Sequence, residues 1–262
     1  MEKPTVNYHT HTARCRHATG TEREFVETAI KEGIKVLGFA DHAPYYFPDG
    51  YYSNFRMLPD ETENYVNTIL SLKKEYATDI DIYLGYEMEY YPAYFDKAVR
   101  QIGQYPHDYL ILGQHFIGNE NDGHIASMRE TDDEGLLRIY VDQIISAMNT
   151  GVYFYVAHPD VFHFVGDKET YVKHYTRLCR EAKRLNVPLE LNLLGVFGGR
   201  HYPNIDFWKI AGEISNDVII GFDAHRPSGL EVDDNYPKIE RIINECGLHI
   251  ISPLSPTVKN DG

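Results

Sequence analysis

Cysteine is scarce in this chain, and its three residues lie far apart. Cys15, Cys179 and Cys246 form neither an even set nor a CxxC pair. The sequence therefore argues against a disulfide framework and against a cysteine-based metal or redox motif. We expect each cysteine to be a small, buried, apolar residue.

The sequence also lacks a long apolar run. No stretch approaches the roughly 20 residues that a membrane-spanning helix requires. The opening residues, MEKPTVNYHT, have neither the basic nor the apolar region of a signal peptide. We therefore predict a cytoplasmic protein with no membrane partner.

Basic residues are few relative to acidic ones. Lysine and arginine number 25 against 39 aspartates and glutamates, so the net charge is −14 with neutral histidines. A surface of this sign repels polyanions and argues against a nucleic-acid partner. A small-molecule substrate is favoured, and bound divalent cations would offset the charge locally so that a phosphate can approach. The sequence gives no indication of oligomeric state.

The length and the hydrophobic pattern predict one α/β domain. With 262 residues, of which 43% are hydrophobic, the chain can bury a full core, and we expect residues 1–262 to form a single domain. Thr21 and Glu24 predict a capping box at the start of a helix that Gly33 ends. Apolar stripes of helical period predict two more helices, over 136–148 and 171–185.

Strand-like runs alternate with these helices. They include LELNLLG from Leu189 and a short segment near Ile250, and about seven alternating units can be counted. This pattern favours parallel strands with crossover helices. A closed, TIM-like β/α barrel would bring the C-terminal ends of all strands to one face. An open doubly wound sheet is the alternative, but it would unite many segments less easily.

Nine side chains of the metal-binding type lie in six short clusters, nearly all where an apolar run ends. They are His9, His11, His17, His42, Glu87, His115, His158, Asp223 and His225. Imidazole nitrogens and carboxylate oxygens suit zinc, manganese and iron, and two or three such ions close together activate water and bind a phosphoryl group. The pattern predicts a multinuclear metal site at the C-terminal ends of the strands.

The repetition of these residues favours a metal site over the alternative, in which each histidine is an ordinary hydrogen-bonded residue. A single histidine is more often a hydrogen-bonded surface or core residue than a ligand. His9 and His11, however, are two apart at a strand end, where alternate side chains point the same way and can chelate one ion. His42, His158 and the Asp223-x-His225 pair then occupy the same position in their own units.

The order of these motifs resembles that of the polymerase and histidinol phosphatase (PHP) family, and the similarity runs from His9 to Arg226. The resemblance implies a distorted (β/α)7 barrel and a trinuclear centre of zinc, manganese or iron. It places His9, His11, Glu87 and Asp223 on one ion, and it makes Glu87 a bridge to a second. The implied ligands of the second ion are His115 and His158, and those of the third are His17, His42 and His225.

Two phrases look most like the monofunctional histidinol phosphatases of that family. These are HTHTxxCxHAxG and GYEMEYYP, the second of which matches a typical GxExDYxP except that Glu89 replaces the aspartate. Glu87 and Glu89 face the same way on a strand, so spacing alone leaves open which one bridges the metals. The motif favours Glu87, and Glu89 then becomes a candidate for supporting a ligand or binding substrate.

The residues also suggest how phosphate would be released. Hydroxide made available by the metals would attack phosphorus in line, with no protein nucleophile. We predict Asp41, Glu87 and His225 as the catalytic residues, with Asp41 as an acid or an orienting group. The alternative role of Asp41, a cap or loop hydrogen bond, is equally open. Arg200 and Arg226 are candidates for binding the phosphate.

Histidinol phosphate would further require an acid for its amine and an aromatic surface for its imidazole. The stretch from Pro44 to Pro59 predicts an ordered loop near the mouth of the site, rich in tyrosine and phenylalanine. Candidates for the acid, among which the sequence does not choose, are Glu89, Glu120, Asp122 and Asp160.

Three functional hypotheses follow. The first is a histidinol-phosphatase of histidine biosynthesis, acting on a small phosphate monoester. The second is another phosphoesterase activity of the same family, such as a phosphotyrosine phosphatase, a nucleotide phosphatase or a nuclease. The third is a non-catalytic metal-binding protein, which is weaker because every expected ligand is present.

Overall fold

The computed structural model describes residues 3–48, 50–123, 125–232, 236–253 and 255–256. Its strands pair in parallel throughout and form two sheets, with the orders β1-β2-β3-β4 and β5-β6-β7. The strands are β1 (Val6–Asn7), β2 (Val36–His42), β3 (Asp81–Glu87), β4 (Tyr109–Ile111), β5 (Leu189–Asn192), β6 (Asp217–Gly221) and β7 (His249–Ile250). The prediction of an α/β fold with parallel strands is confirmed.

The three predicted helices are present, and the first has its predicted capping box. Thr21 forms the capping box with Glu24 at the start of the first helix, and aspartate side chains cap the two long helices of the second half. The helices are α1 (Glu22–Lys31), α2 (Thr62–Glu75), α3 (Phe95–Ile102), α4 (Glu134–Asn149), α5 (Lys168–Leu185), α6 (Leu193–Gly198), α7 (Ile205–Glu213) and α8 (Tyr236–Cys246). Single 3₁₀ turns are η1 (Ala13–Cys15), η2 (Pro59–Glu61) and η3 (Pro227–Leu230).

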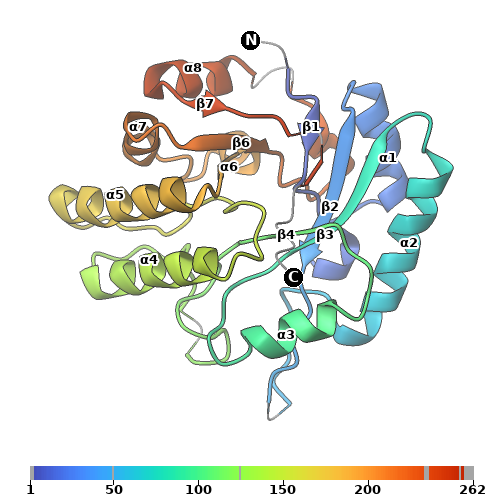
Figure 1. Ribbon diagram of the computed structural model, residues 1–262, viewed down its shortest axis with the longest axis horizontal. Helices are drawn as coiled ribbons and strands as arrows, with labels where there is room; N and C mark the ends of the chain where they lie inside the picture. Colours follow the sequence, from blue (N-terminus) through green and yellow to red (C-terminus); the bar gives the residue numbers. More distant parts are fainter. Residues whose placement is uncertain (1–2, 49, 124, 233–235, 254, 257–262) are drawn as a thin grey trace.

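Isolated bridges join the two sheets at both edges. Thr10 pairs with Ala224, beyond the ends of β1 and β6, while Val156 pairs with Leu112 on one side and Leu189 on the other. The strands therefore curl around a shared interior, and the helices lie outside them. Figure 1 shows α1 and α2 beside β2 and β3, with α4, α5, α7 and α8 on the opposite side, where α7 and α8 lie near β6 and β7.

Two strand-like runs of the sequence do not form the continuous strands that were expected. The run before His158 is not a continuous strand: it makes single bridges at Val156, with Leu112 and Leu189, and its N–H groups donate on both sides, Phe154 to Leu110 O and Val156 to Pro188 O. The LELNLLG run is a strand only as far as Asn192. The Asn192 side chain accepts the Gly195 N–H at 3.1 Å and begins α6 there.

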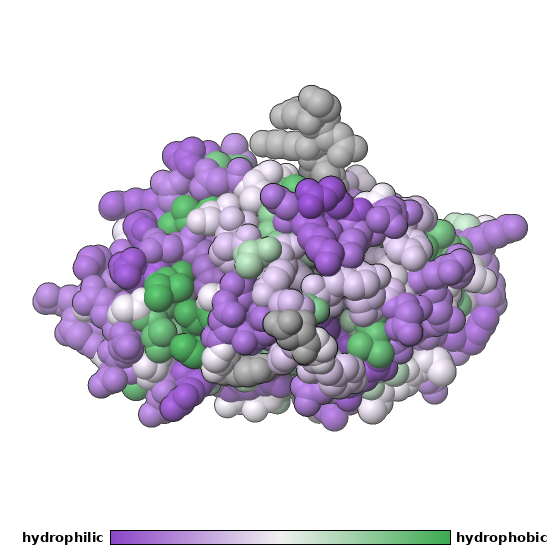
Figure 2. Space-filling view, turned by 90° about the horizontal axis from the view of Figure 1, so that it is seen from below, coloured by the Kyte–Doolittle hydropathy of each residue, from purple (hydrophilic) through white to green (hydrophobic). Residues whose placement is uncertain are grey.

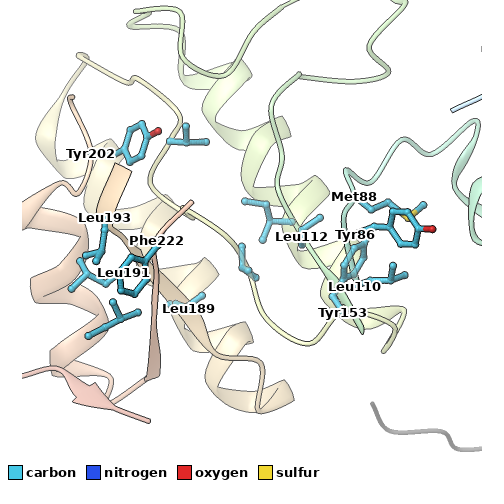
Figure 3. Close-up of a cluster of buried hydrophobic side chains, with 14 of the residues drawn as sticks. Tyr86, Met88, Leu110, Leu112, Tyr153, Leu189, Leu191, Leu193, Tyr202 and Phe222 are labelled. Carbon is cyan, nitrogen blue, oxygen red and sulfur yellow. The ribbon is translucent and has the colours of Figure 1, made fainter. Parts of the chain in front are cut away.

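The core has two parts because the side chains of each strand alternate between two faces. Leu37 and Phe39 of β2 belong to the large cluster that includes the helices, whereas Val36 and Ala40 pack with Tyr109 in a second cluster. Figure 3 shows part of the large cluster, with Leu189, Leu191, Leu193 and Phe222 in one group and Tyr86, Met88, Leu110, Leu112 and Tyr153 in another. The three cysteines are buried and unpaired, as predicted.

Glycines make room for a tyrosine inside the second cluster. Tyr109 donates its hydroxyl to Tyr8 O at 2.6 Å, so its ring is fixed in place. A Cβ at Gly85 would lie 2.6 Å from Tyr109 Cζ, and one at Gly38 would lie 2.9 Å from Tyr8 Cα. These two strand positions therefore require glycine.

Most of the surface in view from below is hydrophilic, with hydrophobic residues in separate patches (Figure 2). Within the described residues, no helix combines the length and apolarity needed to cross a membrane.

Replacing Gly85 by alanine is expected to destabilise the fold by about 1–3 kcal/mol, because the new methyl group overpacks against a ring that cannot move. The melting temperature should fall by about 2–4 °C per kcal/mol, measured by circular dichroism. Gly103→Ala is the control, since Gly103 is exposed and has an ordinary helical backbone with φ −62°. Equal melting temperatures for the two variants would contradict this account of Gly85.

Candidate metal centre

The nine predicted ligands all come from the ends of strands or from the loops that follow them. His42 and Glu87 are the last residues of β2 and β3, and Asp223 follows β6 by two residues. Asn7 joins the ends of β1 and β6, because its Oδ1 accepts the N–H groups of His9 and Phe222, each at 3.0 Å. The fold thus brings these segments together at one end of the strands.

Glu87 lies at the middle of the histidine cluster. One of its oxygens is 2.8 Å from His158 Nε2 and 3.5 Å from His115 Nε2. The other is 3.0 Å from His42 Nδ1 and 3.5 Å from Nε2 of both His9 and His11. A carboxylate that reaches five imidazoles is well placed to bridge metal ions, and Glu87 rather than Glu89 has this position.

Asp223 is a second carboxylate of the cluster, and it contacts two of the same histidines and one more. Its Oδ1 is 3.1 Å from His11 Nε2, 3.5 Å from His9 Nε2 and 3.3 Å from His225 Nδ1. His9, His11 and Asp223 therefore offer three ligand atoms close enough to hold one ion.

The remaining predicted ligands stack against one another. His11, His42 and His225 form another group with ligand atoms close together, and His17 stacks on His225 with ring centroids 4.7 Å apart. Cys15 is a residue that the metal prediction did not include. It is buried and forms a compact group with His17 and His225.

The sequence analysis also missed Glu190, a fully buried acid on β5. Its Oε1 is 2.7 Å from His9 Nδ1, and its Oε2 accepts the backbone N–H of His158 at 3.0 Å and Asn192 Nδ2 at 2.9 Å. Glu190 thus fixes the ring of one predicted ligand and the backbone of another. The signal was present, since this glutamate interrupts the apolar run LELNLLG.

Asp41 and Glu89 lie behind two of the histidines. Asp41 is buried, accepts a hydrogen bond from Thr12 Oγ1, and lies 3.4 Å from His11 Nδ1. Glu89 lies 3.0 Å from His115 Nδ1 and pairs with the buried Arg56. Each carboxylate therefore contacts the ring nitrogen that faces away from Glu87.

Two predicted ligands have left-handed backbones. His158 has φ +29° and Asp223 has φ +51°, values that cost non-glycine residues of the order of 1–3 kcal/mol each. The bond from the His158 N–H to Glu190 holds one of these conformations in place. Such strain is typical of functional sites.

The electrostatics keep the carboxylates ionised. Burial disfavours the charge of Glu87, but nearby histidines, among them His115, His9 and the hydrogen-bonded His158, outweigh it and hold its pKa well below the usual range. Asp223 is also buried, and neighbouring histidines likewise lower its pKa.

The histidines divide into two classes. Burial lowers the pKa of His42 well below its ordinary value and that of His225 to about 3, so both rings are neutral, as metal ligation requires. Burial would also lower the pKa of His9, but Glu190, Asp223 and Glu87 outweigh it and raise this pKa to about 10. A metal ion would have to displace the proton of His9.

The donor set fits divalent metal ions. Four buried polar atoms here make no hydrogen bond of good geometry within the described chain, although all but the last lie close to a neighbouring ring or carboxylate atom: His42 Nδ1, Glu87 Oε2, Asp223 Oδ1 and His158 Nδ1. Buried groups of this kind need partners, and mixed nitrogen and oxygen donors suit zinc, manganese or iron.

A cavity of about 410 Å³ reaches the centre, and seven of the nine predicted ligands line it. Arg200 also lines it, and its guanidinium donates to Tyr202 Oη at 2.8 Å. Arg226 is exposed at the start of η3 and is not among the lining residues. The apolar part of the wall consists of Phe55, Met128, Val161 and Leu194.

The four acids that the sequence offers to bind the amine of the substrate lie outside the cavity wall. Glu89 and Glu120 both pair with Arg56. Asp160 accepts Trp208 Nε1–H at 3.1 Å, and Asp122 accepts Asn119 Nδ2–H at 2.7 Å. None of the four is among the residues that line the cavity.

Comparison with known proteins agrees with this geometry. The family model described as the PHP domain matches residues 7–193. The chain is 29% identical over 247 residues to a probable histidinol-phosphatase of Deinococcus radiodurans, covering 91% of this chain and 92% of the relative. It is 31% identical over 121 residues to the histidinol-phosphatase of Bacillus subtilis, covering 43% and 44% of the two chains.

The fold is similar to a solved structure of histidinol phosphate phosphatase from Lactococcus lactis. The TM-score is 0.73 with 20% sequence identity, and the superposition covers 96% of this chain and 97% of the other. That protein was complexed with zinc, L-histidinol and phosphate. Asp223 and His225 lie beyond the residues that the family model matches, yet the structure places them beside His11.

Metal binding is expected to release protons at pH 7, because His9 has a pKa of about 10 in the metal-free protein. Since protons are products of binding, the affinity should rise with pH. Calorimetric titration of zinc into chelator-treated protein, in two buffers of different ionisation enthalpy, measures the number released. A heat that is independent of the buffer would contradict the expectation.

Glu190→Gln is expected to weaken zinc binding by about 10- to 100-fold, because His9 loses the carboxylate that orients its ring. Competition with a chromophoric chelator gives the affinity. Glu181→Gln is the matched control, since Glu181 pairs with Arg184 on the outer helix α5. If both variants bind zinc like the wild type, Glu190 does not support the centre.

Proposed function

Because the chain belongs to the PHP domain family, we propose that it is a metal-dependent phosphatase that hydrolyses L-histidinol phosphate to L-histidinol and phosphate in histidine biosynthesis. The observation that carries the chemistry is the convergence of five imidazoles on the buried Glu87 carboxylate. The choice of substrate is supported by the relative from Deinococcus radiodurans, which matches along 91% of the chain.

In this proposal residues 1–262 form one domain, and the two curled sheets are parts of a distorted (β/α)7 barrel. Two or three divalent ions would be held by the nine predicted ligands, and ions in such a site supply an activated water nucleophile and offset phosphoryl charge. Glu87 and Asp223, which both contact His9 and His11, would supply the anionic oxygens.

The other residues of the cavity would bind and orient the ester. Arg200 is the guanidinium that reaches the cavity, so we assign it rather than Arg226 to a phosphate oxygen. The apolar wall would accept the organic part of the substrate and exclude water from it. His225 lines the cavity as a neutral ring and would act as a metal ligand, so the leaving oxygen would take its proton from water, whereas Asp41 lies behind His11 and would orient that ring.

The expected activity is phosphate release from L-histidinol phosphate by protein whose metal content has been measured. Comparators are p-nitrophenyl phosphate, a phosphotyrosine peptide and nucleotides. A clear preference for histidinol phosphate supports the proposal. Comparable or better turnover of another ester contradicts the substrate, and no turnover of any ester in the metal-loaded protein would instead favour a non-catalytic metal-binding protein.

His17→Ala and His115→Ala should each lower kcat/KM by at least about 100-fold, since even the loss of a group that only supports a ligand costs 10- to 100-fold. His249→Ala is the control, because this histidine is exposed and pairs with Asp217 away from the centre. Full activity in both ligand variants would refute the metal assignment.

A further inference from the structure

Arg56 is the large charged side chain that lies deepest in the loop between β2 and α2. Only 1% of its surface is exposed. Its guanidinium donates to both oxygens of Glu89, at 2.9 and 3.1 Å, and its Nε donates to Glu120 at 3.0 Å. It also donates to Ala43 O at 3.1 Å and to Tyr91 Oη at 3.2 Å. A buried arginine is stable only when paired in this way.

The same Glu89 carboxylate contacts a predicted metal ligand. Glu89 Oε1 lies 3.0 Å from His115 Nδ1, and the other nitrogen of that ring lies 3.5 Å from Glu87 Oε1. A continuous chain therefore leads from the Arg56 guanidinium, through a carboxylate and an imidazole, to the carboxylate at the middle of the centre. A carboxylate on the outer nitrogen of a histidine fixes its tautomer and orientation.

Phe55 precedes Arg56 and forms part of the cavity wall. Its ring centroid is 4.2 Å from that of His42, 4.9 Å from His115 and 5.2 Å from His17. The described part of segment 43–58 contains neither helix nor strand. Side-chain contacts therefore fix its path, and the Arg56 ion pairs are at the position directly beside Phe55.

We propose that Arg56 is a positioning residue that fixes two side chains of the centre at once. It orients the His115 ring through the Glu89 carboxylate, and it holds the Phe55 ring in the cavity wall because the two residues are adjacent in the backbone. This inference rests on the metal centre of the proposed function. Neither Arg56 nor Phe55 is one of the predicted ligands. Only a planar guanidinium can join two carboxylates, a carbonyl and a hydroxyl in this geometry, so lysine should not replace it.

The test compares Arg56→Lys, Glu89→Gln and Phe55→Leu with Asn216→Ala as the control. Asn216 is also buried and polar, but it binds Cys179 O at 2.9 Å between α5 and β6, away from the cavity. Three quantities are measured for each variant. They are the zinc affinity by chelator competition, KM and kcat with histidinol phosphate as substrate, and the melting temperature.

Three different results are expected. Glu89→Gln lowers zinc affinity by about 10- to 100-fold and leaves KM nearly unchanged. Phe55→Leu raises KM by about 2- to 10-fold, as the loss of an aromatic contact predicts, with zinc affinity unchanged. Arg56→Lys changes both quantities, whereas Asn216→Ala lowers only the melting temperature.

The proposal is overturned if Arg56→Lys loses stability but keeps the zinc affinity and KM of Asn216→Ala, because Arg56 is then only a structural ion pair. Glu89→Gln preserves side-chain size, so it tests the same chain of contacts in a variant whose folding is least disturbed, and unchanged zinc affinity there also overturns the proposal. Zinc affinity does not depend on which ester is hydrolysed. Failure of the proposed substrate is therefore distinguishable from failure of the positioning role.

Discussion

The buried Glu87 carboxylate constrains the rest of this structure. Its side chain is 1% exposed, and its oxygens lie 2.8–3.5 Å from ring nitrogens of five histidines. Breaking a buried charge pair typically costs about 3–5 kcal/mol, so the strand ends that carry these rings cannot separate cheaply. The glycine at position 113 leaves room for this carboxylate, because a Cβ there would lie 1.9 Å from Glu87 Oε1.

A second set of carboxylates holds the histidines from behind. Glu190, Asp41 and Glu89 lie 2.7, 3.4 and 3.0 Å from Nδ1 of three different predicted ligands. The polar interior therefore has two layers, an inner one of predicted metal ligands and an outer one of carboxylates that contact their rings from behind. So many acids close together require compensating cations, which the imidazoles alone supply only when protonated.

Much of the fold could be predicted because its signals are local. Thr21 with Glu24 gives the capping box, apolar periodicity gives α4 and α5, and repeated polar residues at strand ends give the nine predicted ligands. The family and the parallel strands are confirmed. The strand expected throughout LELNLLG was wrong beyond Asn192, since a single side-chain cap there starts a helix.

The supporting residues were harder to predict because their roles depend on tertiary contacts. Arg56 lies in an aperiodic loop, and nothing in the sequence shows that it pairs with Glu89, 33 positions away. Arg200 and Arg226 both follow plausible site motifs, but only the folded loops show that Arg200 reaches the cavity while Arg226 faces solvent. Local pattern predicts the ligand set, whereas the residues that surround it depend on tertiary contacts.

The bridge between Thr10 and Ala224 has a consequence for how the protein is made. Asp223, which contacts His9 and His11, is more than 200 positions away from them in the chain. Contacts of such long range form late, after much loop-closure entropy has been lost. During synthesis the first histidines must therefore wait for β6 to emerge, and a partly made chain would expose an incomplete group of imidazoles and carboxylates to stray metal ions.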